Sequence, residues 1–202
     1  MDLAQRYARH PNMPHELWQE LSRAYTQSGR HYHDLLHLGA MLAELSLVQP
    51  AIQDWDALLF ALFYHDAVYE VSQTDNEAQS AQLALARLSD LGLPAERIDH
   101  CCALILATQH HAHSPLPDAD LFTDADLSIL GQAPETYQTY TAQIRQEYSI
   151  YPDPLYFPGR AKVLMHFLAM PHLYKTDYFR NRYEQQARTN LAAELAAISG
   201  GQ

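Results

Sequence analysis

Basic residues are scarce in this chain of 202 residues. It has 13 Lys and Arg against 24 Asp and Glu, and its formal net charge is −11. A surface of this charge repels a phosphate backbone, and no stretch concentrates enough Lys or Arg to reverse the repulsion. The composition therefore argues against a long nucleic acid as partner.

Long apolar runs and cysteines are also few. The longest apolar run is far below the roughly 18 residues of a membrane span, and the first residues, "MDLAQRYARHPN", are too polar for a signal peptide. We therefore expect a cytoplasmic protein with no membrane partner. The only cysteines, Cys101 and Cys102, are adjacent in an apolar helical pattern, which suits neither a structural disulfide nor a zinc site. We expect them to be small buried residues.

Val and Ile are rare too, with 11 positions against 57 for Ala and Leu. Straight-chain residues lose little side-chain freedom in a helix, whereas β-branched residues lose more. The chain has no repeat of 20 to 50 residues, and its length suits one domain that buries about 70% of its unfolded surface. The sequence thus predicts an all-α fold, a single-domain helical bundle over residues 1–202.

Pro, Gly and capping residues divide the chain into expected helices, with Asp54 as a cap at the start of the third and Gly92 as the stop of the fourth. "HAHSPLPDAD" and "YPDPLYFPG" are expected to be loops. The expected helices run over residues 14–27, 31–48, 54–69, 75–91, 94–111, a short stretch around "LFTDADLSILG", 134–150, 160–170 and 176–198.

One of these helices, "ALLFALFYHDAVYE", places a charged pair directly after an apolar run. The run Ala57–Tyr64 ends in His65 and Asp66. A buried charge is costly unless it is paired or bound to a metal ion. Taken alone, the pair could be a solvated helix end, with His65 near the negative pole of the helix dipole.

Two further patterns supply groups of the same kind. In "RHYHDLLHLGAML", His33 and His37 are four residues apart and would share one face of a helix, as metal ligands or as hydrogen-bonded structural residues. In "DADLFTDADLSILG", Asp124 or Asp126 lies in an otherwise apolar short helix, as a ligand or as a cap. Together the three segments offer two imidazoles and two carboxylates. This set suits a divalent ion such as Mn, Fe, Co, Ni, Zn or Mg and leaves positions open for water.

These motifs resemble the HD-domain superfamily of metal-dependent phosphohydrolases. Its pattern of one His, a later His-Asp pair and a distant Asp, within a helical bundle, falls on His37, His65, Asp66 and, in the form Ala-Asp-Leu, Asp126. A little-characterised bacterial group of about this length is similar through "FYHDAVYE", "DNEAQSA", "LILATQHH", "DADLSILG", "IRQEY" and "ARTNLAAEL". The resemblance implies an HD-type bundle and these four residues as metal ligands.

The stretch "HYHDLLHLGAML" is also similar to the tyrosine-histidine-asparagine motif of cyclic nucleotide phosphodiesterases. That likeness implies His37 as the ligand and His33 as a general acid, although Asp34 stands where those enzymes have Asn. Members of the superfamily include nucleotidases, phosphodiesterases, triphosphohydrolases and a few oxygenases, so the substrate does not follow from the resemblance.

Other residues near the motifs are candidates for smaller roles. Glu70 and Glu77 could each hold a water or reach a second ion. For Glu77 a simpler role is that of a carboxylate in the first turn of a helix, where it suits the helix dipole. Five residues are candidates for binding substrate phosphate: His110, His111, Arg30, Arg145 and Arg160. The two histidines could instead bind a second metal ion or lie at the surface. Each arginine could instead pair with a carboxylate. Tyr137, Tyr140 and Tyr148 recur at helical spacing and could stack on a base or form core.

The sequence therefore favours a metal-dependent phosphohydrolase, a phosphomonoesterase or phosphodiesterase. Its negative charge favours a small phosphorylated metabolite, with a nucleotide foremost, in a pocket of several hundred Å³ beside His65, near "LILATQHH" and "IRQEY". The alternative is a non-catalytic module that senses a metal or nucleotide and acts through a partner; a third reading, a di-iron oxygenase, needs more ligands than the sequence assigns. The number of ions and the oligomeric state, including a homo-oligomer, stay open.

Overall fold

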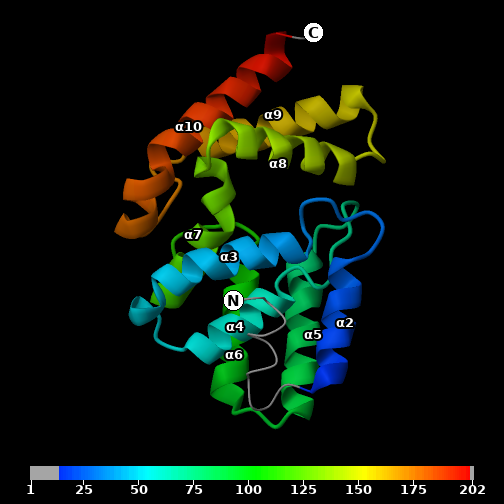
Figure 1. Cartoon of the computed structure of the whole chain (residues 1–202), viewed down its shortest axis with the longest axis vertical. Helices are drawn as coiled ribbons and strands as arrows, with labels where there is room; N and C mark the ends of the chain where they lie inside the picture. The colour runs from blue at the N-terminus through cyan, green and yellow to red at the C-terminus, as the bar shows by residue number, and fades with distance from the viewer. Residues whose placement is uncertain (1–13, 201–202) are drawn as a thin grey trace. The chain divides into compact units, whose positions relative to one another are not determined.

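The computed structural model describes residues 14–200, and within this range every regular element is a helix, which confirms the all-α prediction (Figure 1). The chain divides into two compact units, residues 1–123 and 124–202. Each unit is described by itself. The single domain expected from the sequence depends on how the two units associate, and it stays a prediction.

The first unit is built around α4, a helix that is apolar on every side. Each residue from Ala57 to Tyr64 is buried, as expected for a helix without a polar face. It packs against α3, α5 and α6. The helices of this unit are α2 (His15–Tyr25), α3 (Leu35–Leu47), the short η1 (Gln49–Ala51), α4 (Trp55–Tyr64), α5 (Asn76–Asp90), α6 (Ala95–Ala107) and the start of α7 (Pro117–Asp126).

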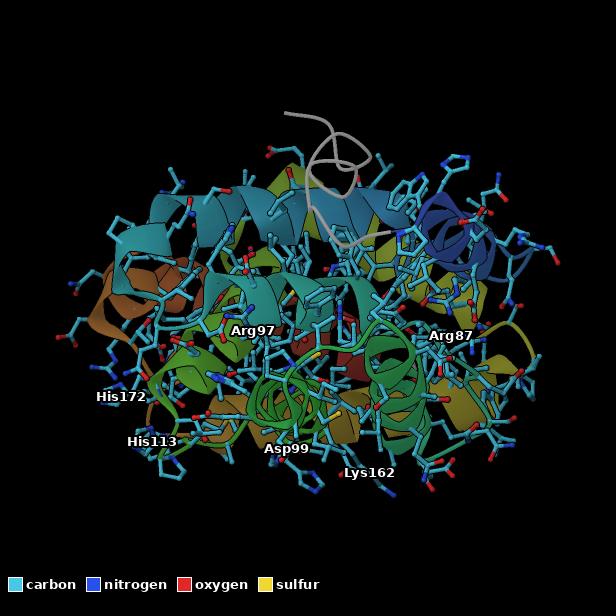
Figure 2. The ribbon with its side chains drawn as sticks, turned by 90° about the horizontal axis from the view of Figure 1, so that it is seen from below. Arg87, Arg97, Asp99, His113, Lys162 and His172 are labelled. Carbon is cyan, nitrogen blue, oxygen red and sulfur yellow. The ribbon has the colours of Figure 1, made fainter. Side chains whose placement is uncertain are left out.

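Capping residues set several of these boundaries. Asp54 accepts a hydrogen bond from the backbone N–H of Ala57 and so starts α4, as the sequence predicts. Gly92 has a φ of 70°, a left-handed conformation that glycine adopts without strain, and it ends α5. Arg97, labelled in Figure 2, reaches from α6 to the carboxylates of Asp54 and Asp56 at the start of α4.

Five predicted boundaries are wrong. The helix expected to reach residue 69 ends at Tyr64. The helix expected from residue 31 begins at Leu35, because Asp34 caps it there, and the one expected to reach residue 111 ends at Ala107. The expected loop "HAHSPLPDAD" already contains the start of α7 at Pro117. The expected break at "YPDPLYFPG" lies largely within α9, because Pro154 falls in the first turn, where no backbone N–H is needed, and Pro158 removes only one hydrogen bond.

The second unit consists of η2 (Leu127–Gly131), α8 (Pro134–Glu147), α9 (Asp153–Ala169) and α10 (Asp177–Gly200). The helix α10 packs against α9 and η2, and α8 also packs against η2. Gly131 allows the close approach of α10, because a Cβ atom there would lie 2.5 Å from Cβ of Tyr183. Among the residues described, no helix is long and apolar enough to cross a membrane.

Candidate metal centre

His65 lies where α4 ends, and the helix end fixes its ring. The last carbonyls of a helix lack partners within the helix. The carbonyl of Leu62 lies 3.0 Å from Nδ1 of His65, and the backbone N–H of Asp66 donates instead to the hydroxyl of Tyr25. With Nδ1–H donated to Leu62, Nε2 is the nitrogen that carries the lone pair whenever the ring is neutral, as it must be to bind a metal ion. A metal-binding histidine commonly donates its second nitrogen to a carbonyl in this way.

His37 comes from the first turn of α3, whose start is set by Asp34. The Oδ1 atom of Asp34 accepts hydrogen bonds from the backbone N–H groups of Leu36 and of His37 itself. The residue that stands in place of the expected Asn is therefore a helix cap, a task for which Asp and Asn are equally suited. The cap holds the backbone of His37, whose side chain is only 3% exposed.

Three potential ligand atoms converge at the end of α4. Nε2 of His65 lies 3.3 Å from Nε2 of His37 and 3.2 Å from Oδ2 of Asp66, and the third distance, from His37 to Asp66, is 3.9 Å. Ligands about 2.1 Å from one ion in tetrahedral or octahedral geometry are about 3.0 to 3.4 Å apart. Two of the three distances fit this range, and the third requires a shift of roughly half an ångström.

Among the described residues, the carboxylate in this cluster has only histidines as ionic partners. Burial acts to raise the pKa of Asp66, but the charge and hydrogen bond of His65, followed by His33 and His37, hold it well below its usual range. Among the residues that the structure describes, no Lys or Arg forms an ion pair with Asp66. A divalent cation would neutralise this carboxylate and bind the Nε2 lone pair of His65, so the donor set fits a metal ion.

His33 lies beside this cluster but not on α3. Its ring is 5.7 Å from that of His37 and 4.4 Å from that of Tyr69, centre to centre. The prediction that both histidines occupy one helix is wrong, since the helix begins after the Asp34 cap. The turn before α3 nevertheless places His33 next to His37. Its role as a general acid stays a prediction.

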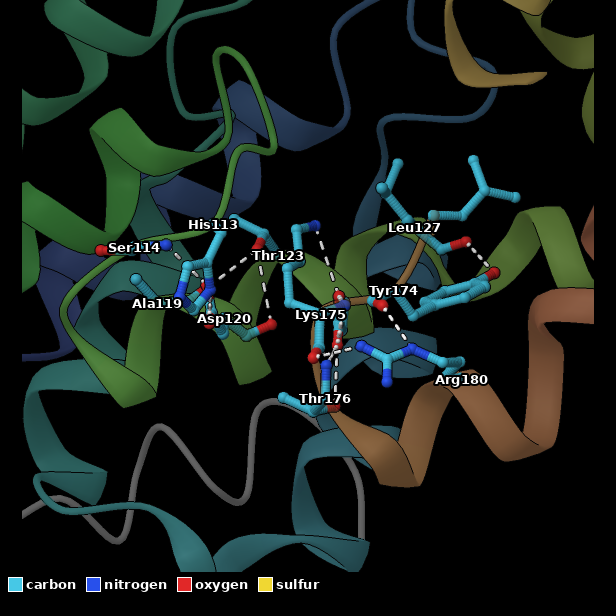
Figure 3. A network of polar contacts seen from close by, with 12 residues as sticks. His113, Ser114, Ala119, Asp120, Thr123, Leu127, Tyr174, Lys175, Thr176 and Arg180 are labelled. Carbon is cyan, nitrogen blue, oxygen red and sulfur yellow. Dashed lines mark hydrogen bonds and ion pairs between the residues drawn. The ribbon is translucent and has the colours of Figure 1, made fainter. Parts of the chain in front are cut away.

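The structure separates the roles of Asp124 and Asp126. Asp124 is fully buried, and its carboxylate accepts hydrogen bonds from the N–H groups of Lys175 and Thr176 and from the Thr176 hydroxyl. Lys175 and Thr176 are labelled in Figure 3. Nζ of Lys175 is 3.3 Å away. Burial raises the pKa of Asp124, although these partners act in the opposite direction. Asp124 is thus a structural residue of the second unit, which leaves Asp126, the half-buried end of α7, as the predicted fourth ligand.

Other candidate residues in the first unit are not brought into this cluster. Glu70 is exposed and accepts a hydrogen bond from Ser72. His110 is exposed in the turn after α6, and His111 follows it with a φ of 50°. Glu77 lies in the first turn of α5, where a carboxylate suits the helix dipole. Their roles with a second ion, a water or a substrate stay predictions.

The three candidate arginines all have structural partners. Arg30 is 9% exposed and donates to the carbonyls of His33 and Ala67. Arg145 pairs with Asp153 and donates to two backbone carbonyls, and Arg160 makes a two-pronged ion pair with Glu194. Phosphate binding by these residues stays a prediction. Tyr137 and Tyr140 are buried, as expected if the three tyrosines form core instead of stacking on a base. The ring of Tyr148 lies near the rings of Tyr151 and Tyr156.

A cavity of about 460 Å³ lies within the second unit. Its lining residues come from α8, α9 and α10: Thr141, Ala142, Arg145, Tyr156, Phe157, Glu194, Ala197 and Ile198. The volume is of the predicted order, and "IRQEY" contributes Arg145. "LILATQHH" contributes nothing to this lining, and the expected pocket beside His65 stays a prediction.

Sequence reasoning missed the residues that hold the ligand segments in place. The hydroxyl of Tyr25 binds the backbone of Asp66, and the ring of Tyr69 contacts that of His33. The one available signal was position, because "RHYHD" and "HDAVYE" keep Arg30 and Tyr69 close in sequence to the motif histidines.

Comparison of the chain with protein-family models, with curated proteins and with solved structures found no match.

Proposed function

We propose that this protein is a metal-dependent phosphohydrolase of the HD-domain type that acts on a small phosphorylated metabolite, in the first place a nucleotide. The observation that supports it best is the convergence of His37, His65 and Asp66 on one point, with the second nitrogen of His65 held by a carbonyl. The resemblance of the motifs supplies the reaction class. Asp126 is the proposed fourth ligand.

When bound, a divalent ion supplies a water of lowered pKa and a positive charge for phosphate oxygens. The chain's own groups do the rest. Asp66 and the two imidazoles hold the ion, and burial of both rings excludes competing water. His33, next to His37 and in contact with the ring of Tyr69, is placed to donate a proton from its ring to a leaving oxygen in the proposed reaction.

The size of the substrate is proposed from charge. A protein of net charge −11 disfavours long polyanions, whereas one divalent ion can bind a single phosphate group or a short phosphate chain. Mononucleotides and similar esters meet this requirement, and oligonucleotides do not.

The test is a screen for phosphate release by metal-free protein reloaded with Mn²⁺. The panel contains mononucleotides, other small phosphate esters, a cyclic nucleotide and oligonucleotides, with Asp66→Asn as the inactive variant and Asp56→Asn, in the first turn of α4, as its control. We expect release from at least one small ester by the wild-type chain and by Asp56→Asn only. A protein that binds Mn²⁺ but hydrolyses nothing in the panel contradicts catalysis and favours the sensing module. Cleavage of oligonucleotides alone contradicts the small substrate.

A further inference from the structure

A second set of contacts ties together the two segments that carry the ligands. Arg30 lies between α2 and α3. Its Nη1 donates to the carbonyl of His33 over 3.0 Å, and its Nη2 donates to the carbonyl of Ala67 over 3.2 Å. His33 precedes the helix of His37, and Ala67 directly follows Asp66. One guanidinium group therefore joins both segments at their backbones.

Two aromatic rings enclose this guanidinium and contact the same segments. Its central carbon lies 4.9 Å from the ring centre of Tyr25 and 5.3 Å from that of Tyr69, within the range of cation–π attraction. The hydroxyl of Tyr25 accepts a hydrogen bond from the N–H of Asp66, while the ring of Tyr69 contacts that of His33 at an angle of 31°. We name Tyr25, Arg30 and Tyr69 the Arg30 clamp.

The charge of Arg30 has an unusual environment. A buried arginine is normally paired with a carboxylate, but among the described residues Arg30 forms no ion pair, and its Nε is buried without a hydrogen-bond partner. Its partners are two carbonyls and two rings. A planar fork of N–H donors serves such a bridge, and a lysine ammonium group does not reproduce it. Because Arg30 is only 9% exposed, with both terminal nitrogens bound to backbone, it is poorly placed to bind a substrate phosphate.

We infer that Arg30 is a positioning residue of the metal centre, which holds the His37 segment and the His65–Asp66 segment at the spacing that an ion requires. This inference rests on the proposed function, and it replaces the substrate-binding role that the sequence suggests for Arg30. Groups that orient metal ligands without touching the ion typically change metal affinity about 10–100-fold when they are removed.

The experiment is a titration of the metal-free chain with Mn²⁺, with free Mn²⁺ followed by electron paramagnetic resonance. Arg30→Met removes the fork and the charge, and Arg30→Lys keeps the charge but not the fork. Arg87→Met is the matched control, because it removes an arginine of the same unit whose ion pair with Glu20 joins α2 to α5. Circular dichroism at the titration temperature verifies that each variant is folded.

We expect the Kd for Mn²⁺ to rise about 10–100-fold in Arg30→Met and at least several-fold in Arg30→Lys, with Arg87→Met equal to the wild type. If Arg30→Met does not fold, Arg30→Lys decides the question. Equal Kd values in the wild type and in the folded Arg30 variants overturn the inference. The inference is also overturned if the Arg30 variants bind Mn²⁺ as tightly as the wild type but, once loaded with Mn²⁺, bind inorganic phosphate more weakly. That result makes Arg30 a phosphate ligand. A wild-type chain that binds no Mn²⁺ contradicts the proposed function itself.

Discussion

The carboxylates of Glu194 and Asp124 in the second unit differ from that of Asp66 in the first unit in their partners. In the second unit, Glu194 is paired with Arg160 and also accepts the hydroxyl of Tyr137, and Asp124 accepts four hydrogen bonds beside Lys175. In the first unit, Asp66 has imidazoles as its ionic partners. Glu194 and Asp124 are already neutralised by the chain, so they are structural. Of these three carboxylates, Asp66 is the one whose surroundings suit an added cation.

The largest effect on stability is expected from Glu194→Gln. The side chains of Arg160 and Glu194 are 8% and 12% exposed, so this change leaves a buried guanidinium without its counter-charge. Loss of one partner of a buried pair typically costs about 3–5 kcal/mol. Urea unfolding measures the loss, with Glu135→Gln, an exposed residue of α8, as control. A change below about 1 kcal/mol would remove the contrast between the units.

Metal binding is expected to give the next largest effect. An ion that binds only the folded chain adds about 2.7 kcal/mol to the free energy of unfolding when it is present at 100 times its Kd. Unfolding curves with and without Mn²⁺ measure the gain. His65→Ala should show none, because it removes the imidazole nearest to both other ligands. An equal gain in His65→Ala would place the ion elsewhere.

Asp54 tests a carboxylate of the first unit that does have a cationic partner. Burial acts to raise its pKa, but the N–H of Ala57 and then Arg97 outweigh this effect, so the pKa is lowered. A carboxylate whose pKa is lower in the folded chain stabilises the fold at pH values above its ordinary pKa. This contribution is lost as the pH falls through the lowered pKa. Asp54→Ala should cost about 1 kcal/mol at neutral pH. The difference from the wild type should shrink below about pH 4. A difference independent of pH would exclude a role for the charge.

The smallest effect is expected from Asp66→Asn in the metal-free chain. The only ionic partners of this charge are histidines, so at a pH where these rings are neutral the lost contact with His65 is offset by easier burial of the neutral amide. We expect the free energy of unfolding without metal to change by less than about 1 kcal/mol. A loss as large as that of Glu194→Gln would show that Asp66 is a structural carboxylate after all.

Local chemistry in the sequence predicts much of this fold. The apolar run that forms α4, the Asp54 cap and the Gly92 stop all act through neighbouring residues, and all three are confirmed. The Pro-rich start of α9 was mistaken for a break, because a proline in a first turn and one in a loop look alike without the neighbouring helices.

The candidate site divides in the same way. The motifs indicated His37, His65 and Asp66, which come together in the structure. The partners of Arg30 and Asp124 could not be predicted, because each depends on a segment distant in the sequence: Arg30 binds Ala67, and Asp124 binds Thr176. Such contacts leave no periodic pattern in either segment.

The most direct test of the metal centre is the number of divalent ions bound per chain, measured by elemental analysis after saturation with Mn²⁺ and removal of free ion. We predict at least one ion in the wild type and in Asp56→Asn, and at least one fewer in Asp66→Asn, whose Kd should rise by at least about tenfold. Equal occupancy and equal Kd in Asp66→Asn and in the wild type would contradict the claim that His37, His65 and Asp66 form a metal site.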